Sequence, residues 1–374
     1  MVEHGTAFPN GTVTWNPEVN ATNSSCPWPE EWQWVLQIQP AFLWLIAIVG
    51  VVENLFVLSV WCFHKSRCTV AEIYLANLAM ADLLLLCGLP FWAINITKNF
   101  DWPFGLILCK IVNTMLFMNL YSSIYFAVMV SIDRYLALVK TMSLGRMRQP
   151  MCAKWNCLVI WVSALFLCSP VLVFRSLKYV HDYKVTACIL EYPSITQWAI
   201  ITTVLLNTVG FLMPVCIITY CTVQIIQALQ NHEIQKIKSI QTEKKATILV
   251  LAVLLLFIIC WLPFQISTFL DMLHRIKFII GCDAEQAINV ASQIAVYCGF
   301  SNSCLNPIVY VIVGKHFRRK CKEVYLGRFP RRHSSAPSVQ TVTTMETVQT
   351  SFSVENQRKK SDVSLSQKHN LLVS

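Results

Sequence analysis

The sequence predicts an all-α membrane protein, a bundle of seven transmembrane helices followed by a short amphipathic eighth helix. Of its 374 residues, 55% are hydrophobic and only 13% are charged, whereas a soluble domain averages about 25% charged residues. Seven apolar segments are each long enough to cross a hydrocarbon core of roughly 30 Å. They span residues 40–63, 72–97, 108–138, 155–175, 198–229, 244–272 and 288–313.

The positions of lysine and arginine predict the orientation of the chain, because cytoplasmic loops retain these residues. With the N-terminus outside, the cytoplasmic segments hold Lys65, Arg67, Arg134, Lys140, Arg146, Arg148, Lys154, Lys236, Lys238, Lys244, Lys245 and a basic tail. We therefore expect a multi-pass plasma-membrane protein with a cytoplasmic C-terminus. Its net charge of +10 then lies against anionic lipid of the bilayer, and no nucleic acid is expected as a partner.

Residues 1–39 are predicted to form an extracellular tail. They contain no lysine or arginine and carry three N-glycosylation acceptors, at Asn10, Asn20 and Asn23. Four cysteines fall on the extracellular side, at Cys26, Cys109, Cys188 and Cys282. Four cysteines allow three disulfide pairings, and the spacing does not choose among them.

Polar residues at membrane depth point to a buried site in the middle of the bundle. Asp82 lies inside the second apolar segment, and Asn119 and Ser123 lie at a similar depth in the third. A charge at this depth costs several kcal/mol unless it faces partners or water. A carboxylate with amide and hydroxyl oxygens suits a small hard cation, so we predict an allosteric sodium site here and no other cofactor. Structural hydrogen bonding between helices is the alternative.

The cytoplasmic end of the third segment carries Asp133, Arg134 and Tyr135. An arginine there can pair with Asp133 in one state and be released to a partner in another, as a two-state switch requires. Pro214, Pro263 and Pro307 lie within the last three segments. Each proline removes a backbone donor and kinks its helix, so we expect hinges there. Residues 40–313 form the predicted transmembrane domain.

Residues 314–326 are predicted to lie on the inner leaflet as an amphipathic helix. Phe317, Cys321 and Val324 can share its apolar face, and Cys321 is a candidate for palmitoylation. From residue 327 to 374 apolar density falls, which predicts a disordered cytoplasmic tail. Its candidate phosphorylation sites are Ser334, Ser335, Ser338, Thr341, Thr343 and Thr344.

These features together resemble the rhodopsin-like (class A) G-protein-coupled receptors over roughly residues 40–325. The matching positions, in order, are Asn54, Leu78-Ala-x-Ala-Asp82, Cys109, Asp133-Arg134-Tyr135, Trp161, Pro214, Cys260-Trp261-Leu-Pro263 and Asn306-Pro307-x-x-Tyr310. Within that class the chain is most similar to the type-2 branch of the bradykinin (kinin) receptors. The stretches that carry this likeness are RCTVAEIYLANLA, CGLPFWAI, NFDWPFG, NLYSSI, SIDRYLALVKTMS and LLLFIICWLPFQISTFLD.

The resemblance implies two disulfides, Cys109 to Cys188 and Cys26 to Cys282. It also implies a short cationic peptide agonist with arginine at each end. A guanidinium is bound best by a carboxylate in fork geometry, and Asp271 is the leading candidate, with Asp283 and Glu285 near it in the sequence. Further predicted ligand residues are Trp92, Asn113, Arg175, Trp261, Gln265, Thr268, Gln293 and Tyr297, with Arg175 for the peptide carboxylate.

For signalling, the resemblance implies that Arg134 engages a heterotrimeric G protein, with the loops around 140–153 and 230–245. Asn306, Pro307 and Tyr310 complete the switch, Trp261 is the toggle beneath the ligand, and Tyr310 closes the cytoplasmic side. Kinin receptors act mainly through Gq-type G proteins, phospholipase C and calcium. Receptor kinases and arrestin would act on the phosphorylated tail.

The sequence departs from the family pattern at two positions. It has Asn289 where type-2 kinin receptors usually carry an acid, which weakens one anchor for a peptide arginine. It has Thr222 where class A receptors often have a tyrosine, which concerns the detail of activation.

Three other function classes compete with this interpretation. A class A receptor for another short peptide, angiotensin-like or chemokine-like, fits the four extracellular cysteines equally well. A transporter would show internal repeats, and we find none. An intramembrane enzyme would need a base or metal ligands at membrane depth, yet all eight histidines fall in loops, termini or helix ends. We therefore expect no enzymatic activity.

Overall fold

The computed structural model describes residues 33–64, 68–139, 149–181, 184–231 and 237–326. The predicted glycosylation and phosphorylation sites, Cys26 and the tail from residue 327 lie outside these described residues. The predicted domain boundaries are untested by the structure at both ends.

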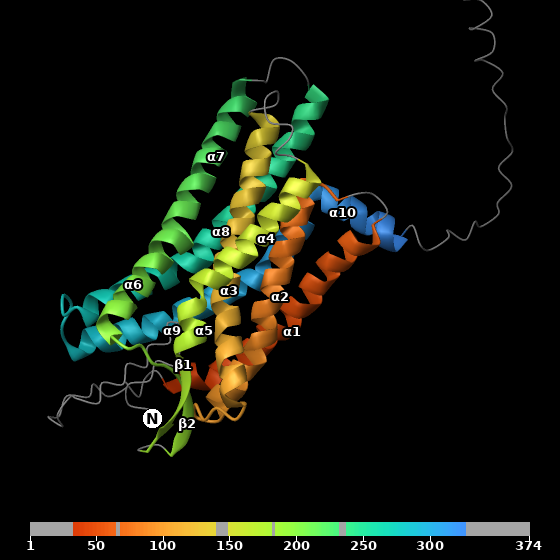
Figure 1. Ribbon diagram of the computed structural model, residues 1–374. Coiled ribbons are helices and arrows are strands. Elements are labelled where there is room, and N and C mark those ends of the chain that lie inside the picture. Colours follow the sequence, from red (N-terminus) through yellow and green to blue (C-terminus); the bar gives the residue numbers. More distant parts are fainter. Residues whose placement is uncertain (1–32, 65–67, 140–148, 182–183, 232–236, 327–374) are drawn as a thin grey trace, which may run out of the picture. The chain divides into compact units, whose positions relative to one another are not determined.

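The described residues contain seven helical spans that are long and apolar enough to cross a membrane. Six of them are α1 (Gln33–Phe63), α2 (Val70–Thr97), α3 (Gly105–Leu138), α4 (Pro150–Leu167), α8 (Ile237–Arg275) and α9 (Cys282–Val313). The remaining span is interrupted: it runs through α6 (Ile195–Asn207), the π-helical segment η3 (Thr208–Leu212) and α7 (Met213–Asn231). The helices lie side by side as a bundle (Figure 1), which confirms the predicted fold class.

Two of the predicted helices are broken, and proline accounts for both breaks. Pro214 is the second residue of α7, which follows η3, and it has no backbone N–H to donate to the preceding turn, which is widened to a π-helix. The predicted helix 155–175 ends at Leu167, and a short helix α5 (Ser169–Phe174) follows with Pro170 in its first turn. By contrast, Pro263 and Pro307 lie inside continuous helices.

A two-stranded antiparallel sheet follows α5, and the sequence did not predict it. Strand β1 (Arg175–Val180) pairs with β2 (Val185–Leu190), and the register places Leu177 opposite Cys188. The hairpin lies at one end of the bundle, and α10 lies near the other end (Figure 1).

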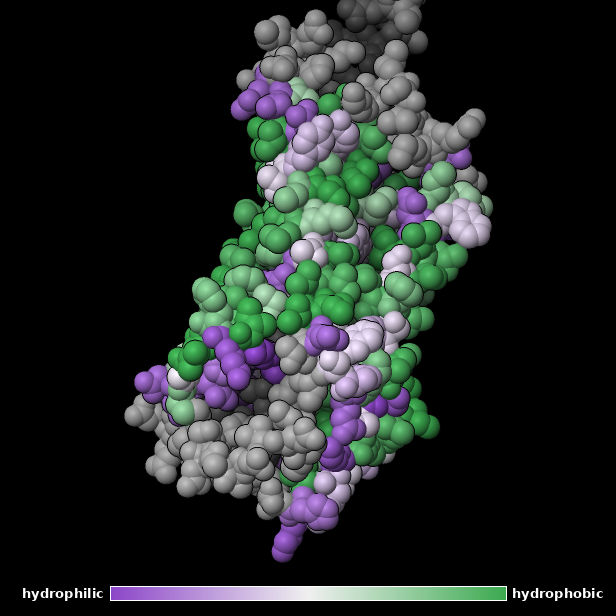
Figure 2. Space-filling model, turned by 60° about the vertical axis from the view of Figure 1, so that its left-hand side comes forward, coloured by the Kyte–Doolittle hydropathy of each residue, from purple (hydrophilic) through white to green (hydrophobic). Residues whose placement is uncertain are grey.

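Apolar side chains divide between two buried clusters and the outer face. One cluster contains Trp92, Cys109 and Trp261, and the other contains Tyr74 and Tyr310. Outward residues remain apolar, and Figure 2 shows hydrophobic side chains over the middle of one face with hydrophilic ones toward its ends. An apolar surface of this extent fits a lipid environment.

Helix α10 (Lys315–Cys321) and the π-helical segment η4 (Lys322–Leu326) form the predicted eighth helix. Phe317 and Val324 are buried, and Cys321 packs against the cluster that contains Tyr310. The apolar face thus lies on the bundle. Lys320 is buried too, which the amphipathic pattern did not indicate: its Nζ lies 2.7 Å from Oε1 of Glu72 on α2.

Candidate functional site

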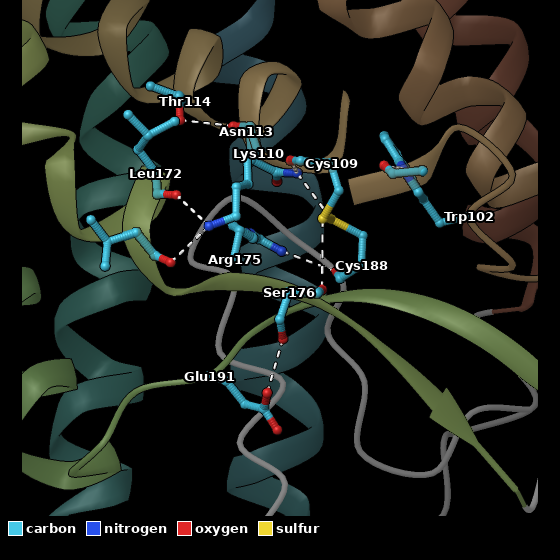
Figure 3. The surroundings of a disulfide bond; sticks show 12 residues. Trp102, Cys109, Lys110, Asn113, Thr114, Leu172, Arg175, Ser176, Cys188 and Glu191 are labelled. Carbon is cyan, nitrogen blue, oxygen red and sulfur yellow. Dashed lines mark hydrogen bonds between the residues drawn. A yellow bond between two sulfur atoms is a disulfide. The ribbon is translucent and has the colours of Figure 1, made fainter. Parts of the chain in front are cut away.

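A disulfide joins the first turns of α3 to strand β2. Cys109 and Cys188 are bonded across 79 residues of sequence, with their Cα atoms 5.8 Å apart, and Figure 3 shows the bond beside the hairpin. This confirms one of the two expected disulfides. Cys282 is also disulfide-bonded, and its expected partner Cys26 lies outside the described residues.

Two predicted ligand residues lie against this disulfide (Figure 3). The side-chain amide of Asn113 donates to the Cys109 carbonyl at 2.7 Å and to the Cys188 sulfur at 3.4 Å. Nη1 of Arg175 donates to the Cys188 carbonyl at 3.1 Å. The disulfide therefore positions an amide from α3 and a guanidinium from β1 on the same side of the hairpin.

Arg175 is a buried cation, and only some of its guanidinium donors form hydrogen bonds. Its residue is 2% exposed, and burial lowers the pKa of its guanidinium to about 10, so it is still charged at neutral pH. Its Nε and Nη2 atoms have no hydrogen-bond partner among the described residues. A buried charge with unused donors favours an anion that can accept from both.

The hairpin is held over the bundle by further contacts that the sequence did not predict. Lys110 Nζ donates to the carbonyls of Leu172 and Val173 at 3.1 and 2.9 Å, at the end of α5 (Figure 3). The loop between α2 and α3 also joins β2, since the Trp102 amide donates to the Thr186 carbonyl at 2.8 Å. These bonds leave the hairpin little freedom to move away from α3.

Deeper in the bundle, two further predicted residues hold buried polar atoms. Trp261 Nε1 and both side-chain polar atoms of Gln265 lack hydrogen-bond partners within the described ranges. Gly299 makes room for the indole, because a Cβ there would lie 2.8 Å from Cζ3 of Trp261. Beside the indole is a small apolar hollow lined by Leu116, Phe117, Leu120, Trp261, Phe264, Val296 and Phe300.

Trp92, like Trp261 and Gln265, is a predicted ligand residue with a buried polar atom. Its indole is 5% exposed and packs edge-on against Trp102, with the ring centroids 6.2 Å apart. Its Nε1 also has no hydrogen-bond partner in the part of the chain that the structure describes. Buried donors of this kind are rare in folded proteins unless a ligand or water binds them.

Three other predicted ligand residues make contacts between helices. Gln293 accepts from Gln39 on α1 at 2.9 Å, and Thr268 accepts from Asn207 on α6 at 3.2 Å. Tyr297 packs edge-on against Phe42, with centroids 5.6 Å apart. In this arrangement they support the walls of the bundle.

The predicted acidic anchors differ in their surroundings. Asp271 forms a two-point ion pair with Arg275, one turn later on α8. Asp283 is exposed and Glu285 is half-buried in the first turn of α9. Both oxygens of Asp271 are therefore engaged by a guanidinium of its own helix.

The polar residues at membrane depth do come together around Asp82, which is fully buried. Its carboxylate accepts from Asn119 at 3.0 Å, from Ser303 at 2.8 Å and from Asn306 at 3.0 Å. Asn119 also donates to the hydroxyl of Ser123 at 3.1 Å. Four side chains from α3 and α9 therefore enclose one carboxylate of α2.

This cluster has the atoms that a small cation requires. The side-chain oxygens of Asn119 and Asn306 are buried and have no hydrogen-bond partner among the described residues. The amide nitrogens face Asp82 here, so a cation beside the carboxylate, which would prefer oxygen ligands, would need both amides to turn over.

Near the C-terminal end of α3, Arg134 donates to Asp133 at 2.8 Å. Asp133 is 4% exposed. Tyr135, which follows Arg134, contacts Tyr220 of α7, with ring centroids 6.1 Å apart. The predicted pairing of the arginine with its neighbouring carboxylate is therefore present, and the aromatic contact with Tyr220 was not predicted.

Tyr310 connects the end of α9 to two other elements. Its ring is 1% exposed and lies 6.4 Å from the rings of both Trp61 on α1 and Phe317 on α10. It follows Asn306 and Pro307 on one helix. The proline segment thus leads from the Asp82 cluster to the docked eighth helix.

Comparison with known proteins agrees with this geometry. Residues 53–310 match the family model described as 7 transmembrane receptor (rhodopsin family). The chain belongs to the rhodopsin family of seven-transmembrane receptors. This receptor is 58% identical to the B2 bradykinin receptor of Oryctolagus cuniculus over 90% of its own length and 92% of that protein. It is 58% identical to the B2 bradykinin receptor of Homo sapiens, over 91% and 88% of the two chains, and 38% identical to the human B1 bradykinin receptor, over 81% and 86%.

The receptor therefore falls within the bradykinin-receptor branch of that family, and it is a multi-pass membrane protein and not an enzyme. Sequence reasoning missed Lys110, Lys320 and Glu72. Each is a charged residue near the end of an apolar segment, where charge is expected at the membrane surface. Only the three-dimensional arrangement shows that Lys110 donates to the carbonyls at the end of α5 and that Lys320 and Glu72 form a buried ion pair.

Proposed function

We propose that this protein is a cell-surface receptor for kinin peptides that activates heterotrimeric G proteins. The observation that carries the proposal is a group of buried side chains with unused polar atoms beneath the disulfide-tied hairpin, on α2, α3, β1 and α8. They are Trp92, Asn113, Arg175, Trp261 and Gln265. Ligand pockets place a few such polar groups within apolar walls.

The charges of this region suit a peptide that has a carboxylate at one end and arginine at both. Arg175 offers two unused donors to the peptide carboxylate. Asp271, with Asp283 and Glu285, offers carboxylates to the peptide guanidinium groups. The names of the relatives, which are bradykinin receptors, support the same class of ligand. Asn289 stands where one of the acidic anchors is expected, so Asp271 carries more of the recognition in this chain.

Signalling would pass through the cytoplasmic end of α3. Arg134 is held by Asp133 in this arrangement, and its release would allow it to contact a G protein of the Gq type, which activates phospholipase C and calcium release. The tail beyond residue 326, with Ser334, Ser335, Ser338, Thr341, Thr343 and Thr344, would then be phosphorylated by receptor kinases and bound by arrestin.

The orientation and modifications follow from this proposal. The N-terminus is extracellular and carries glycans at Asn10, Asn20 and Asn23, and Cys26 is the disulfide partner of Cys282. The C-terminus is cytoplasmic. Cys321 would take a palmitoyl chain, for which its half-buried side chain must turn from the bundle toward the inner leaflet.

Calcium release in cells that express the full chain tests the proposal. We expect a response to bradykinin and none to angiotensin peptides, in cells where surface receptor is confirmed. Arg134→Ala is the matched variant: it should bind labelled bradykinin normally yet lose nucleotide exchange on the G protein.

Silence to every kinin with receptor present at the surface would contradict the kinin assignment. A response to an angiotensin or chemokine peptide would replace it with another peptide class. Normal signalling by Arg134→Ala would remove that residue from the switch.

A further inference from the structure

The strongest predicted anchor for a peptide arginine already holds an arginine of the same helix. Arg275 Nε lies 2.8 Å from Asp271 Oδ2, and Arg275 Nη2 lies 3.2 Å from Oδ1. Both carboxylate oxygens are therefore engaged by one guanidinium. The two side chains are only 23% and 18% exposed, for Asp271 and Arg275.

This contact has the geometry that a peptide arginine would need. A guanidinium and a carboxylate bind best as a planar fork with two parallel hydrogen bonds. A carboxylate that is occupied in this way cannot form a second such fork in the same plane. The incoming peptide must therefore displace Arg275 from Asp271 or accept a weaker, single contact.

We propose that Arg275 is an internal competitor for Asp271 and thereby lowers the affinity of the ligand site for its peptide. This inference rests on the proposed function, in which Asp271 binds a peptide arginine. A peptide arginine can replace the fork of Arg275 with an equivalent fork. A lysine offers only a compact point charge, so it cannot recover the two hydrogen bonds that are lost. The cost of displacing Arg275 is the same for both cations, so the competition lowers the affinity for each of them.

The test is a competition binding assay with bradykinin on membranes from cells that express full-length variants. Arg275→Gln removes the competing charge and should tighten binding by roughly three- to tenfold, since a partly buried ion pair of this kind is worth on the order of 1 kcal/mol. Arg275→Lys keeps the charge but cannot form the two-point contact, so it should tighten bradykinin binding less than Arg275→Gln does. The measured quantity is the dissociation constant, which does not depend on how much receptor folds.

The second arm uses the peptide. A bradykinin analogue in which the arginine that meets Asp271 is replaced by lysine should bind wild-type receptor more weakly than bradykinin, and Arg275→Gln should raise the affinity for both peptides by a similar factor. An analogue with neutral citrulline in place of the arginine that meets Asp271 should bind wild type and Arg275→Gln equally well, because it makes no use of the released carboxylate.

Two controls separate competition from general charge repulsion. Lys277→Gln removes the same charge two residues later, from an exposed position in the loop after α8. It should leave the dissociation constant nearly unchanged. The double variant Asp271→Asn/Arg275→Gln should bind no more tightly than Asp271→Asn alone. An equal gain from Lys277→Gln, or a gain that persists without the Asp271 carboxylate, would overturn the proposal.

Failure of this inference is distinguishable from failure of the proposed function. If no kinin binds the wild-type receptor, the function is wrong. Loss of a charge-assisted contact predicts that Asp271→Asn weakens bradykinin binding by roughly ten- to a hundredfold. If that loss is observed but Arg275→Gln does not tighten binding, only the competition is wrong. If Asp271→Asn changes nothing, Asp271 is not the anchor and the competition is also excluded.

Discussion

Arg175 is a buried guanidinium that uses only part of its hydrogen-bonding capacity within the described residues. It is held by its neighbours on one edge, where Nη1 donates to the Cys188 carbonyl, and its other donors are buried without a described partner. Burial lowers the pKa of its guanidinium only to about 10. The group is therefore charged throughout the physiological range, and an anionic ligand group is the natural complement.

We predict that Arg175→Gln weakens the binding of bradykinin. The variant should lose about 1.5–3 kcal/mol, because it removes a hydrogen-bonded charge pair with the peptide carboxylate. Competition binding at fixed salt measures this loss. A bradykinin whose carboxyl end is amidated is the matched probe: it should bind wild type and Arg175→Gln with similar affinity.

The pH dependence has a defined sign. Arg175 is charged below its pKa, so its contribution should be constant from about pH 6 to 8 and decline only as the pH approaches 10. A marked loss of Arg175-dependent affinity between pH 6 and 8 would mean that another group binds the carboxylate.

Helix α10 is attached to the bundle by more than its apolar face. Lys320 and Glu72 form an ion pair whose side chains are only 4% and 8% exposed. Glu72 also accepts from the Thr69 backbone amide at 2.8 Å, as part of the capping box that begins α2. One carboxylate thus serves both the start of α2 and the docking of α10.

We therefore predict that Lys320→Met destabilises the receptor strongly, by about 3–5 kcal/mol, because it leaves a buried carboxylate unpaired. Thermal unfolding of purified receptor in detergent measures the effect. Arg319→Met is the matched control on the same helix. Its ion pair with Glu323 is exposed, with side chains 69% and 51% exposed, and its loss should cost less than about 1 kcal/mol.

The double variant Glu72→Leu/Lys320→Met should be less destabilised than the sum of its single variants, since it removes both charges together. Additive losses would show that the two residues act independently and that the pair does not hold α10 in place.

The whole molecule is connected through the cluster around Asp82. This carboxylate of α2 accepts hydrogen bonds from α3 and α9, and α9 continues through Asn306 and Pro307 to Tyr310 beside α10. We therefore expect a change in the cluster to affect both ends of α9, as coupling between two sites requires.

We predict that sodium weakens agonist binding by stabilising the arrangement described here, and that Asp82→Asn abolishes this effect. Bradykinin competition curves in sodium and in an equal concentration of a bulky organic cation measure the difference at constant ionic strength. A sodium effect that persists in Asp82→Asn would place the ion elsewhere. Equal curves for wild-type receptor in the two salts would remove the sodium site from the account.

The sequence by itself determined the class of the protein. Seven apolar segments and the lack of charge require lipid as the solvent, and backbone groups in lipid must be satisfied within helices. The ordered motifs from Asn54 to Tyr310 then identified the family and the Asp82 cluster, because polar residues at membrane depth have few alternatives to one another. The amphipathic period also placed Phe317 and Val324 on one face, but it directed that face toward the inner leaflet, whereas the structure buries both side chains within the protein.

Only the tertiary structure decided which partner each charged or polar side chain has. Arg134 paired with Asp133 as expected, but Asp271 proved to be engaged by Arg275, and Lys320 proved to be buried against Glu72. A charged residue near the end of a helix can face solvent, lipid headgroups or another helix, and the local pattern is the same in all three cases. The packing of neighbouring helices makes that choice, because it fixes which opposite charge lies within hydrogen-bonding distance.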